Sequence, residues 1–90
     1  MHIVADRDKL LARVRRIAGQ VAAVERQLTG EAGCSETLQL VASVRGAVGS
    51  LMEELIEQHM HEHVACPGLS DEARAAAAEE MLALIRRYGK

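Results

Sequence analysis

The sequence predicts an all-α protein: one domain spanning residues 1–90, built from three helices and completed by association with further copies of itself. Ala, Leu, Val, Glu and Arg dominate the 90 residues, and most of these are helix formers. Apolar residues recur at steps of three and four, and no alternating strand pattern appears. One proline-free segment is too long for so small a domain to cover by itself, which favours an oligomer.

The first helix is expected at about residues 6–28. Its apolar positions alternate at steps of four and three, the pattern of a helix that packs along a seam, and are Leu10, Val14, Ile17, Val21, Val24 and Leu28. Gly30 and Gly33 in the following segment are stop signals, so a turn separates this helix from the next.

The second helix is expected at about residues 34–65, before Pro67 and Gly68 end it. Roughly 32 residues correspond to about 48 Å at 1.5 Å per residue. This helix therefore requires packing against another subunit. The third helix, about residues 70–88, opens with Ser70 as N-cap and closes with basic residues that complement the helix dipole.

The composition argues against several classes of function. The chain is 49% apolar but contains one aromatic residue, Tyr88, which argues against a pocket for a drug-sized substrate. No nucleophile, base and orienting group form a set, so no enzyme is expected. No segment is apolar enough to span a bilayer, and charges occupy the place of a signal peptide. With only Cys34 and Cys66, we expect a cytoplasmic protein with reduced thiols and no membrane partner.

The segment EQHMHEHVACP, residues 57–67, suggests metal binding. His59 and His63 are four residues apart and share one helix face, which is the usual way for a helix to offer two imidazoles to one ion. His61 points to roughly the opposite side. The alternative interpretation is a solvated helix end, where histidines also interact well with the dipole.

A third ligand has to come from far along the chain. Cys34 precedes His59 by 25 residues, or about 37 Å of helix, so one subunit cannot bring the two together. Two antiparallel copies of the second helix would bring Cys34 of one subunit to the histidines of the other. The two-fold axis would then fall near Ala47–Val48, giving two equivalent sites per dimer.

Small residues surround that expected axis. Gly46 and Gly49 cost roughly 1 kcal/mol each in a helix interior relative to Ala, which suggests a packing reason such as close approach of two backbones.

The N-terminus offers further ligands, because His2 stands beside the amino group of Met1. Thiolate and imidazole donors suit Zn, Co, Ni or Cu and disfavour Ca and Mg. Four ligands would suit tetrahedral zinc, whereas an added amine or backbone ligand would favour six-coordinate nickel or cobalt. The alternatives are a disordered terminus for His2 and a small apolar role for Cys34.

Three nearby side chains have weaker claims. Glu62 is a candidate acceptor for an imidazole N–H, or simply a solvated glutamate. His61 and Cys66 are interpreted mainly as bystanders, although Cys66 would be a soft extra ligand if it took part.

A basic stripe follows the first helix. Lys9, Arg13 and Arg16 lie at i, i+4 and i+7, Arg7 and Arg15 widen the patch, and Arg45 adds a charge on the second helix. Repeated by symmetry in an oligomer, this stripe would follow a DNA backbone. The alternative is a solvated helix face. No helix-turn-helix is evident, since the second helix is too long.

Together these segments resemble the CsoR/RcnR/FrmR family of bacterial repressors. The resemblance rests on RVRRIAGQVAAVERQL, Cys34, LQLVASVRGAVGSLMEELIEQH and a following EH, and covers residues 7–64 closely. It implies an antiparallel four-helix dimer core, a tetramer formed as a dimer of dimers, and binding to operator DNA without a helix-turn-helix. Arg13 and Arg16 match basic positions associated with DNA binding in the family.

The branches of the family differ in their ligand positions. His2, Cys34, His59 and His63 occupy all four positions of the RcnR-like nickel and cobalt branch. The copper branch would carry a second cysteine near His63. The formaldehyde branch, which is similar along the first helix, has a proline after the initiator methionine and no histidine at the position of His63.

The sequence therefore predicts a repressor that holds operator DNA through Lys9, Arg13, Arg15, Arg16 and Arg45, and releases it when Ni or Co, or alternatively Zn, binds His2, Cys34, His59 and His63. One alternative is a formaldehyde sensor that uses Cys34 and the N-terminal amine. The other is a helical metal-binding module without DNA binding.

Overall fold

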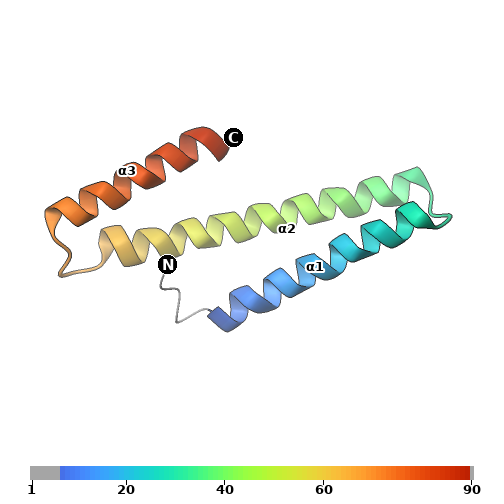
Figure 1. Ribbon diagram of the computed structural model, residues 1–90, viewed down its shortest axis with the longest axis horizontal. Coiled ribbons are helices and arrows are strands. Elements are labelled where there is room, and N and C mark those ends of the chain that lie inside the picture. The colour runs from blue at the N-terminus through green and yellow to red at the C-terminus, as the bar shows by residue number, and fades with distance from the viewer. Residues whose placement is uncertain (1–6, 90) are drawn as a thin grey trace. The chain divides into compact units, whose positions relative to one another are not determined.

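The computed structural model describes residues 7–89 (Figure 1). They form α1 (Arg7–Thr29), α2 (Cys34–Met60), the π-helical segment η1 (His61–Ala65) and α3 (Asp71–Tyr88). No strand occurs in residues 7–89, so the predicted all-α class is confirmed. The described residues group into two compact units that meet within α2, one ending at Glu53 and the other beginning at Glu54.

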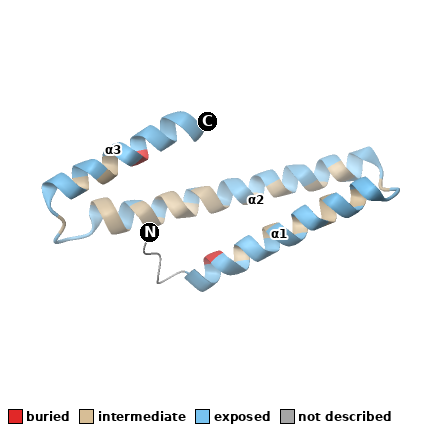
Figure 2. Ribbon diagram, viewed as in Figure 1, coloured by how far each residue is buried: buried red, intermediate tan, exposed pale blue. Residues whose placement is uncertain are grey.

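The apolar positions predicted to form a seam on α1 lie in two rows along the helix, one covered and one exposed; Figure 2 colours the residues by burial. Leu10 is buried, and Ile17 and Val24, one and two heptads further on, are half-buried. The other row is exposed: Val14, Val21 and Leu28 retain 45%, 52% and 71% of their accessible surface. Only one row of the seam is therefore covered within the subunit. Thr29 ends the helix by donating its hydroxyl hydrogen bond to the Glu25 and Arg26 carbonyls.

Residue Cys34 begins α2, as predicted. The Gly33 carbonyl accepts the first helical bond from the Thr37 N–H at 3.2 Å, so Gly33 stands at the N-cap. One side of α2 is half-covered, at positions such as Val44 and Ala47. Another side carries Leu38, Val41 and Val48, which are 64%, 46% and 46% exposed.

In the second unit, α3 packs against η1. Gly68 adopts a φ of +87°, which lets the chain turn between them. The Ser70 hydroxyl accepts from the Ala73 N–H at 3.0 Å, confirming the predicted N-cap. Arg74 extends back to donate to the Cys66 carbonyl at 3.3 Å, which ties α3 to the turn.

The described residues contain a very small core, because only Leu10 and Met81 are buried. Twelve large apolar side chains of residues 7–89 stay exposed. A folded chain that leaves so much apolar surface uncovered favours a partner subunit, although the oligomeric state itself remains a prediction. Among residues 7–89, no helix combines the length and apolar character that a membrane span requires.

Candidate metal centre

The imidazole rings of His59 and His63 lie together at the end of α2. Their centroids are 4.8 Å apart and their planes are tilted by 46°. The predicted shared face is therefore confirmed. Both side chains are half-buried, and the His59 Nε2 atom is buried without a hydrogen-bond partner in the described chain. A buried nitrogen without a partner is costly and is the kind of donor that a metal ion would use.

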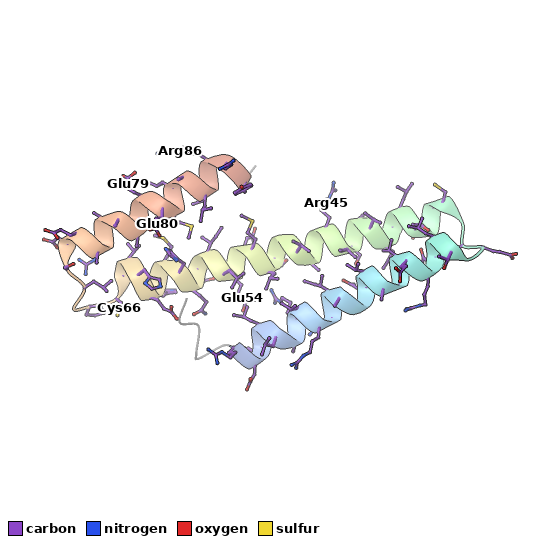
Figure 3. The ribbon with its side chains drawn as sticks, in the orientation of Figure 1. Arg45, Glu54, Cys66, Glu79, Glu80 and Arg86 are labelled. Carbon is purple, nitrogen blue, oxygen red and sulfur yellow. The ribbon has the colours of Figure 1, made fainter. Side chains whose placement is uncertain are left out.

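A pocket opens beside the two rings. It has a volume of about 350 Å³ and is lined by His59, His63, Glu80 and three alanines of α3, Ala73, Ala76 and Ala77. The small alanine side chains leave this space next to the imidazoles. In Figure 3, Glu80 lies on the side of α3 toward this pocket, whereas Glu79 lies on the other side. The pocket gives a ligand access to the rings and places one carboxylate along its wall.

The local backbone differs from the expected α-helix. The helix does extend to Ala65, but α2 stops at Met60 and residues His61–Ala65 form a π-helical turn that carries His63. Pro67 has no N–H to continue the ladder, and Cys66 before it is extended at φ −63° and ψ 131°, as a following proline favours. Single π turns of this kind occur frequently at functional sites.

Carboxylates stand beside the histidines on both sides of the turn. Glu62 Oε2 lies 3.6 Å from His63 Nε2, too far for a hydrogen bond, and this oxygen has no hydrogen-bond partner in the described residues. Glu62 therefore lies beside the ring that it is expected to orient, and the orienting role itself stays a prediction. His61 Nε2 instead lies 3.8 Å from Glu57 Oε1 on a well-exposed surface, away from the ring pair.

The predicted ligands that the structure describes do not form a three-ligand site within one chain. Cys34 is exposed at the start of α2, and His59 stands near its end. Within the described residues, no group of three or more His, Cys, Asp and Glu side chains could hold a metal ion. His2 lies outside the described residues. Any three-ligand site built on the histidine pair therefore needs a donor from another chain or from the N-terminus.

One face of α2 connects Cys34 with His59. Between them, at steps of three and four, come Leu38, Val41, Arg45, Val48, Met52 and Leu55. We call the apolar residues of this series, with Cys34 and His59, the α2 seam, and leave the charged Arg45 out of it. Its apolar members near Cys34 are exposed. Beside the seam, a Cβ added to Gly46 or Gly49 would meet no atom of the described residues within 4 Å outside the adjoining turns of its own helix, so packing among residues 7–89 does not explain either glycine.

The basic residues occupy two separate places. Arg13 and Arg16 line a pocket between α1 and α2, together with Ile17, Gln20, Ala47 and Ser50. Lys9 and Arg15 are exposed on α1. Arg45 points away from α1 on the far side of α2 (Figure 3), so a single chain does not join it to the stripe.

Three polar residues of these two pockets, Gln20, Ser50 and Glu80, were not predicted from the sequence. Gln20 follows Arg13 and Arg16 at the spacing of one helix face, and that spacing could have revealed it. No sequence signal marks Ser50 or Glu80, whose positions depend on how the helices pack.

The comparisons with known proteins agree on one family. A family model described as metal-sensitive transcriptional repressor matches residues 6–87. The chain is 44% identical over 89 residues to an uncharacterized protein in the bioA 5′ region of Serratia marcescens, covering 99% of this chain and 98% of the relative. It is 44% identical over 73 residues to the transcriptional repressor RcnR of Salmonella arizonae, covering 81% of this chain and 79% of that one.

A solved structure gives the same result. The formaldehyde-responsive regulator FrmR of Salmonella enterica serovar Typhimurium, in a variant with histidine in place of one glutamate, is similar with a TM-score of 0.90 and 40% identity. The match covers 98% of this chain and 99% of the FrmR chain. Members of the matched family are transcriptional regulators and not enzymes. The chain therefore belongs to the CsoR/RcnR/FrmR family of metal-sensitive transcriptional repressors.

Proposed function

We propose that this repressor binds operator DNA in its metal-free form and releases it when nickel or cobalt binds, with zinc as the second choice of ion. The observation that carries the proposal is the pair His59 and His63, whose rings are 4.8 Å apart beside a pocket, with one buried nitrogen that has no described protein partner. Two imidazoles in this arrangement fit a transition metal, provided that further donors complete the site.

The proposed site is shared between subunits. Antiparallel pairing of two α2 seams covers the exposed side chains of Leu38, Val41 and Val48. It also brings Cys34 of one subunit to His59 and His63 of another. The open space around Gly46 and Gly49 supports this pairing, because glycines near the axis let two backbones approach. Each dimer then has two equivalent sites, and two dimers form the proposed homotetramer.

The donor set directs the choice of ion. Cys34, His59 and His63 supply one sulfur and two nitrogens, which suit ions from cobalt to zinc. His2 and the terminal amine are the proposed additional donors, and they favour six-coordinate nickel or cobalt over tetrahedral zinc. The ion would supply a common centre for donors that different segments carry. Glu62 would orient the His63 ring through its second nitrogen.

The proposed operator surface consists of cations on both long helices: Lys9, Arg13, Arg15 and Arg16 of α1, and Arg45 of α2. Within one chain these form two groups, so the proposal needs the tetramer to align them along DNA. His2 lies five residues before α1 begins. Its recruitment to the site would pull on the helix that carries most of these cations, which couples the metal site to the DNA surface.

The coupling between metal binding and DNA binding can be tested in both directions. If metal lowers DNA affinity by some factor, DNA must lower metal affinity by the same factor. Fluorescence anisotropy with a duplex from upstream of the protein's own gene, with and without nickel, measures the first factor. Nickel titration of free and DNA-bound protein measures the second. Equal affinity for DNA with and without every candidate ion would refute the sensor proposal. Acting on DNA, the repressor would work in the cytoplasm.

A second candidate is formaldehyde sensing, and the similarity to FrmR favours it. Cys34 is a free, exposed thiol. One carbon from formaldehyde could link its thiolate to an N-terminal amine. Such a bridge adds one carbon and releases water, a net gain of about 12 Da. Mass spectrometry of protein treated with formaldehyde, compared with Cys34→Ala, tests this candidate.

A further inference from the structure

The polar residues that line the pocket between α1 and α2 are all hydrogen-bond donors. Arg13, Arg16 and Gln20 come from one face of α1, and Ser50 comes from α2. All four side chains can donate hydrogen bonds, and no carboxylate of residues 7–89 lines the pocket. Ile17 and Ala47 complete the lining with apolar surface.

The size of the pocket indicates a small ligand. Its volume is about 250 Å³, below the roughly 300–1,000 Å³ typical of sites for drug-sized molecules. It also opens to solvent, and Arg16 and Ser50 are exposed while Gln20 is half-buried. An ion can therefore enter without a rearrangement of the helices.

Three of the hydrogen-bond donors that line the pocket are available to bind a ligand. In residues 7–89, Arg16, Gln20 and Ser50 form no hydrogen bond or ion pair with one another or with other described side chains. Arg13 does hold another interaction, so the site is built on the other three, with Arg13 as a nearby charge. A guanidinium fork, an amide and a hydroxyl that line one pocket suit the oxygen lone pairs of a tetrahedral oxyanion.

We propose that this pocket is a receptor for one phosphate group, with Gln20 and Ser50 as ligands beside Arg16. Two sources carry this chemistry: a free phosphate ion or phosphate monoester, and a phosphate of a DNA backbone. The second source rests on the proposed DNA binding, whereas the first does not. In either case the bound group joins α1 and α2, because Arg16 of α1 and Ser50 of α2 line the same pocket.

The first experiment adds inorganic phosphate in place of chloride, so that the ionic strength stays constant. Titration followed by ¹⁵N NMR should show saturable shifts of the Gln20 side-chain amide with one phosphate per subunit. Gln20→Ala and Ser50→Ala should each weaken binding about tenfold, the effect of removing one hydrogen bond to a charged group. Arg16→Lys should weaken it as well, because it keeps the charge but loses the fork.

The matched control is Arg26→Ala, which removes an exposed α1 cation that does not line the pocket. This control should bind phosphate as the unchanged protein does. Circular dichroism of every variant checks that the helices are retained. Absence of saturable shifts at Gln20, or equal phosphate binding by Gln20→Ala, Ser50→Ala and Arg26→Ala, would overturn the receptor.

The second arm separates the two sources with a mixed-sequence DNA duplex at low salt. If a backbone phosphate occupies the pocket, phosphate competes with DNA, and Gln20→Ala and Ser50→Ala reduce the affinity for DNA. Arg16→Ala then also reduces the salt slope by about one for each subunit whose Arg16 contacts DNA, because that cation no longer neutralises a phosphate. If the ligand is the free ion, Gln20→Ala and Ser50→Ala bind DNA as Arg26→Ala does while phosphate binding is weakened. A protein that binds phosphate but no DNA would refute the proposed repressor function and leave the receptor in place.

Discussion

The rings of His59 and His63 lie 4.8 Å apart, although one belongs to an α-helix and the other to a π-helical turn. They share a pocket with Glu80, and His61 between them in sequence lies elsewhere, beside Glu57. This separation of neighbouring histidines is the basis for the most specific prediction about the site.

Replacing His63 by Ala should lower nickel affinity by more than about 100-fold. Loss of an outer hydrogen-bond partner alone typically costs 10–100-fold, and His63 is a proposed direct ligand. Competition titration against a chelator of known affinity measures the change. His61→Ala is the matched control and should bind nickel normally. The site is misassigned if the two variants lose affinity equally.

The two cysteines allow a similar comparison, because both are free and exposed. Cys34→Ala should abolish the effect of metal on DNA binding, since the thiolate is the proposed donor from the second subunit. Cys66→Ala should respond as the unchanged protein does. Ni(II) complexes with a thiolate ligand show a sulfur-to-metal charge-transfer band in the near ultraviolet, and this band should vanish only in Cys34→Ala. Its persistence there would exclude Cys34 as a ligand.

The mid-helix glycines test the antiparallel pairing. In an isolated helix, Gly→Ala stabilises by about 1 kcal/mol, and among the described residues no atom outside the adjoining turns of α2 lies within 4 Å of a Cβ added to Gly46 or Gly49. We expect Gly49→Ala nevertheless to weaken the dimer, because a second backbone approaches there. Gly19 is equally open and lies outside the α2 seam, so Gly19→Ala should stabilise. Sedimentation equilibrium and thermal melting distinguish these outcomes; stabilisation by both would contradict the pairing.

A charge introduced into the exposed α2 seam should disrupt the oligomer more strongly than the added methyl group of Gly49→Ala. Val48 is 46% exposed in the single chain and lies at the proposed axis, where it would meet its own copy. Val48→Glu should place two buried like charges together and convert the oligomer to monomers, detectable by light scattering after gel filtration. Val44→Glu is not a suitable control, as Val44 is half-buried within the chain. Ser43→Glu, at an exposed position on another face, should leave the oligomer intact.

Much of the fold was predictable from local signals. Helical periodicity, Gly33 and the Ser70 cap set boundaries that agree with the structure to within one or two residues. The π turn at His61–Ala65 was not predicted, since both helix types give a similar apolar pattern over so few residues. The division of the α1 seam into covered Leu10 and exposed Val14 also required the structure, because a repeat of three and four does not say which partner covers each row.

The candidate site was predictable in part. The spacing of His59 and His63 predicted the ring pair, and the separation of 25 residues between Cys34 and His59 predicted that residues 7–89 of one chain form no three-ligand site with them. Glu80, Gln20 and Ser50 were missed because their positions depend on packing between helices. His2 lies outside the described residues, so its role remains a prediction.

The most direct test of the central claim is a parallel titration of operator release with Ni(II), Co(II), Zn(II), Cu(I) and formaldehyde, followed by anisotropy of labelled DNA. The proposed ligand set predicts that Ni(II) and Co(II) release the DNA at the lowest free ion concentrations, that Zn(II) acts more weakly, and that Cys34→Ala abolishes all three responses. Release by formaldehyde alone, with no metal causing release, would contradict metal sensing and establish the aldehyde-responsive alternative.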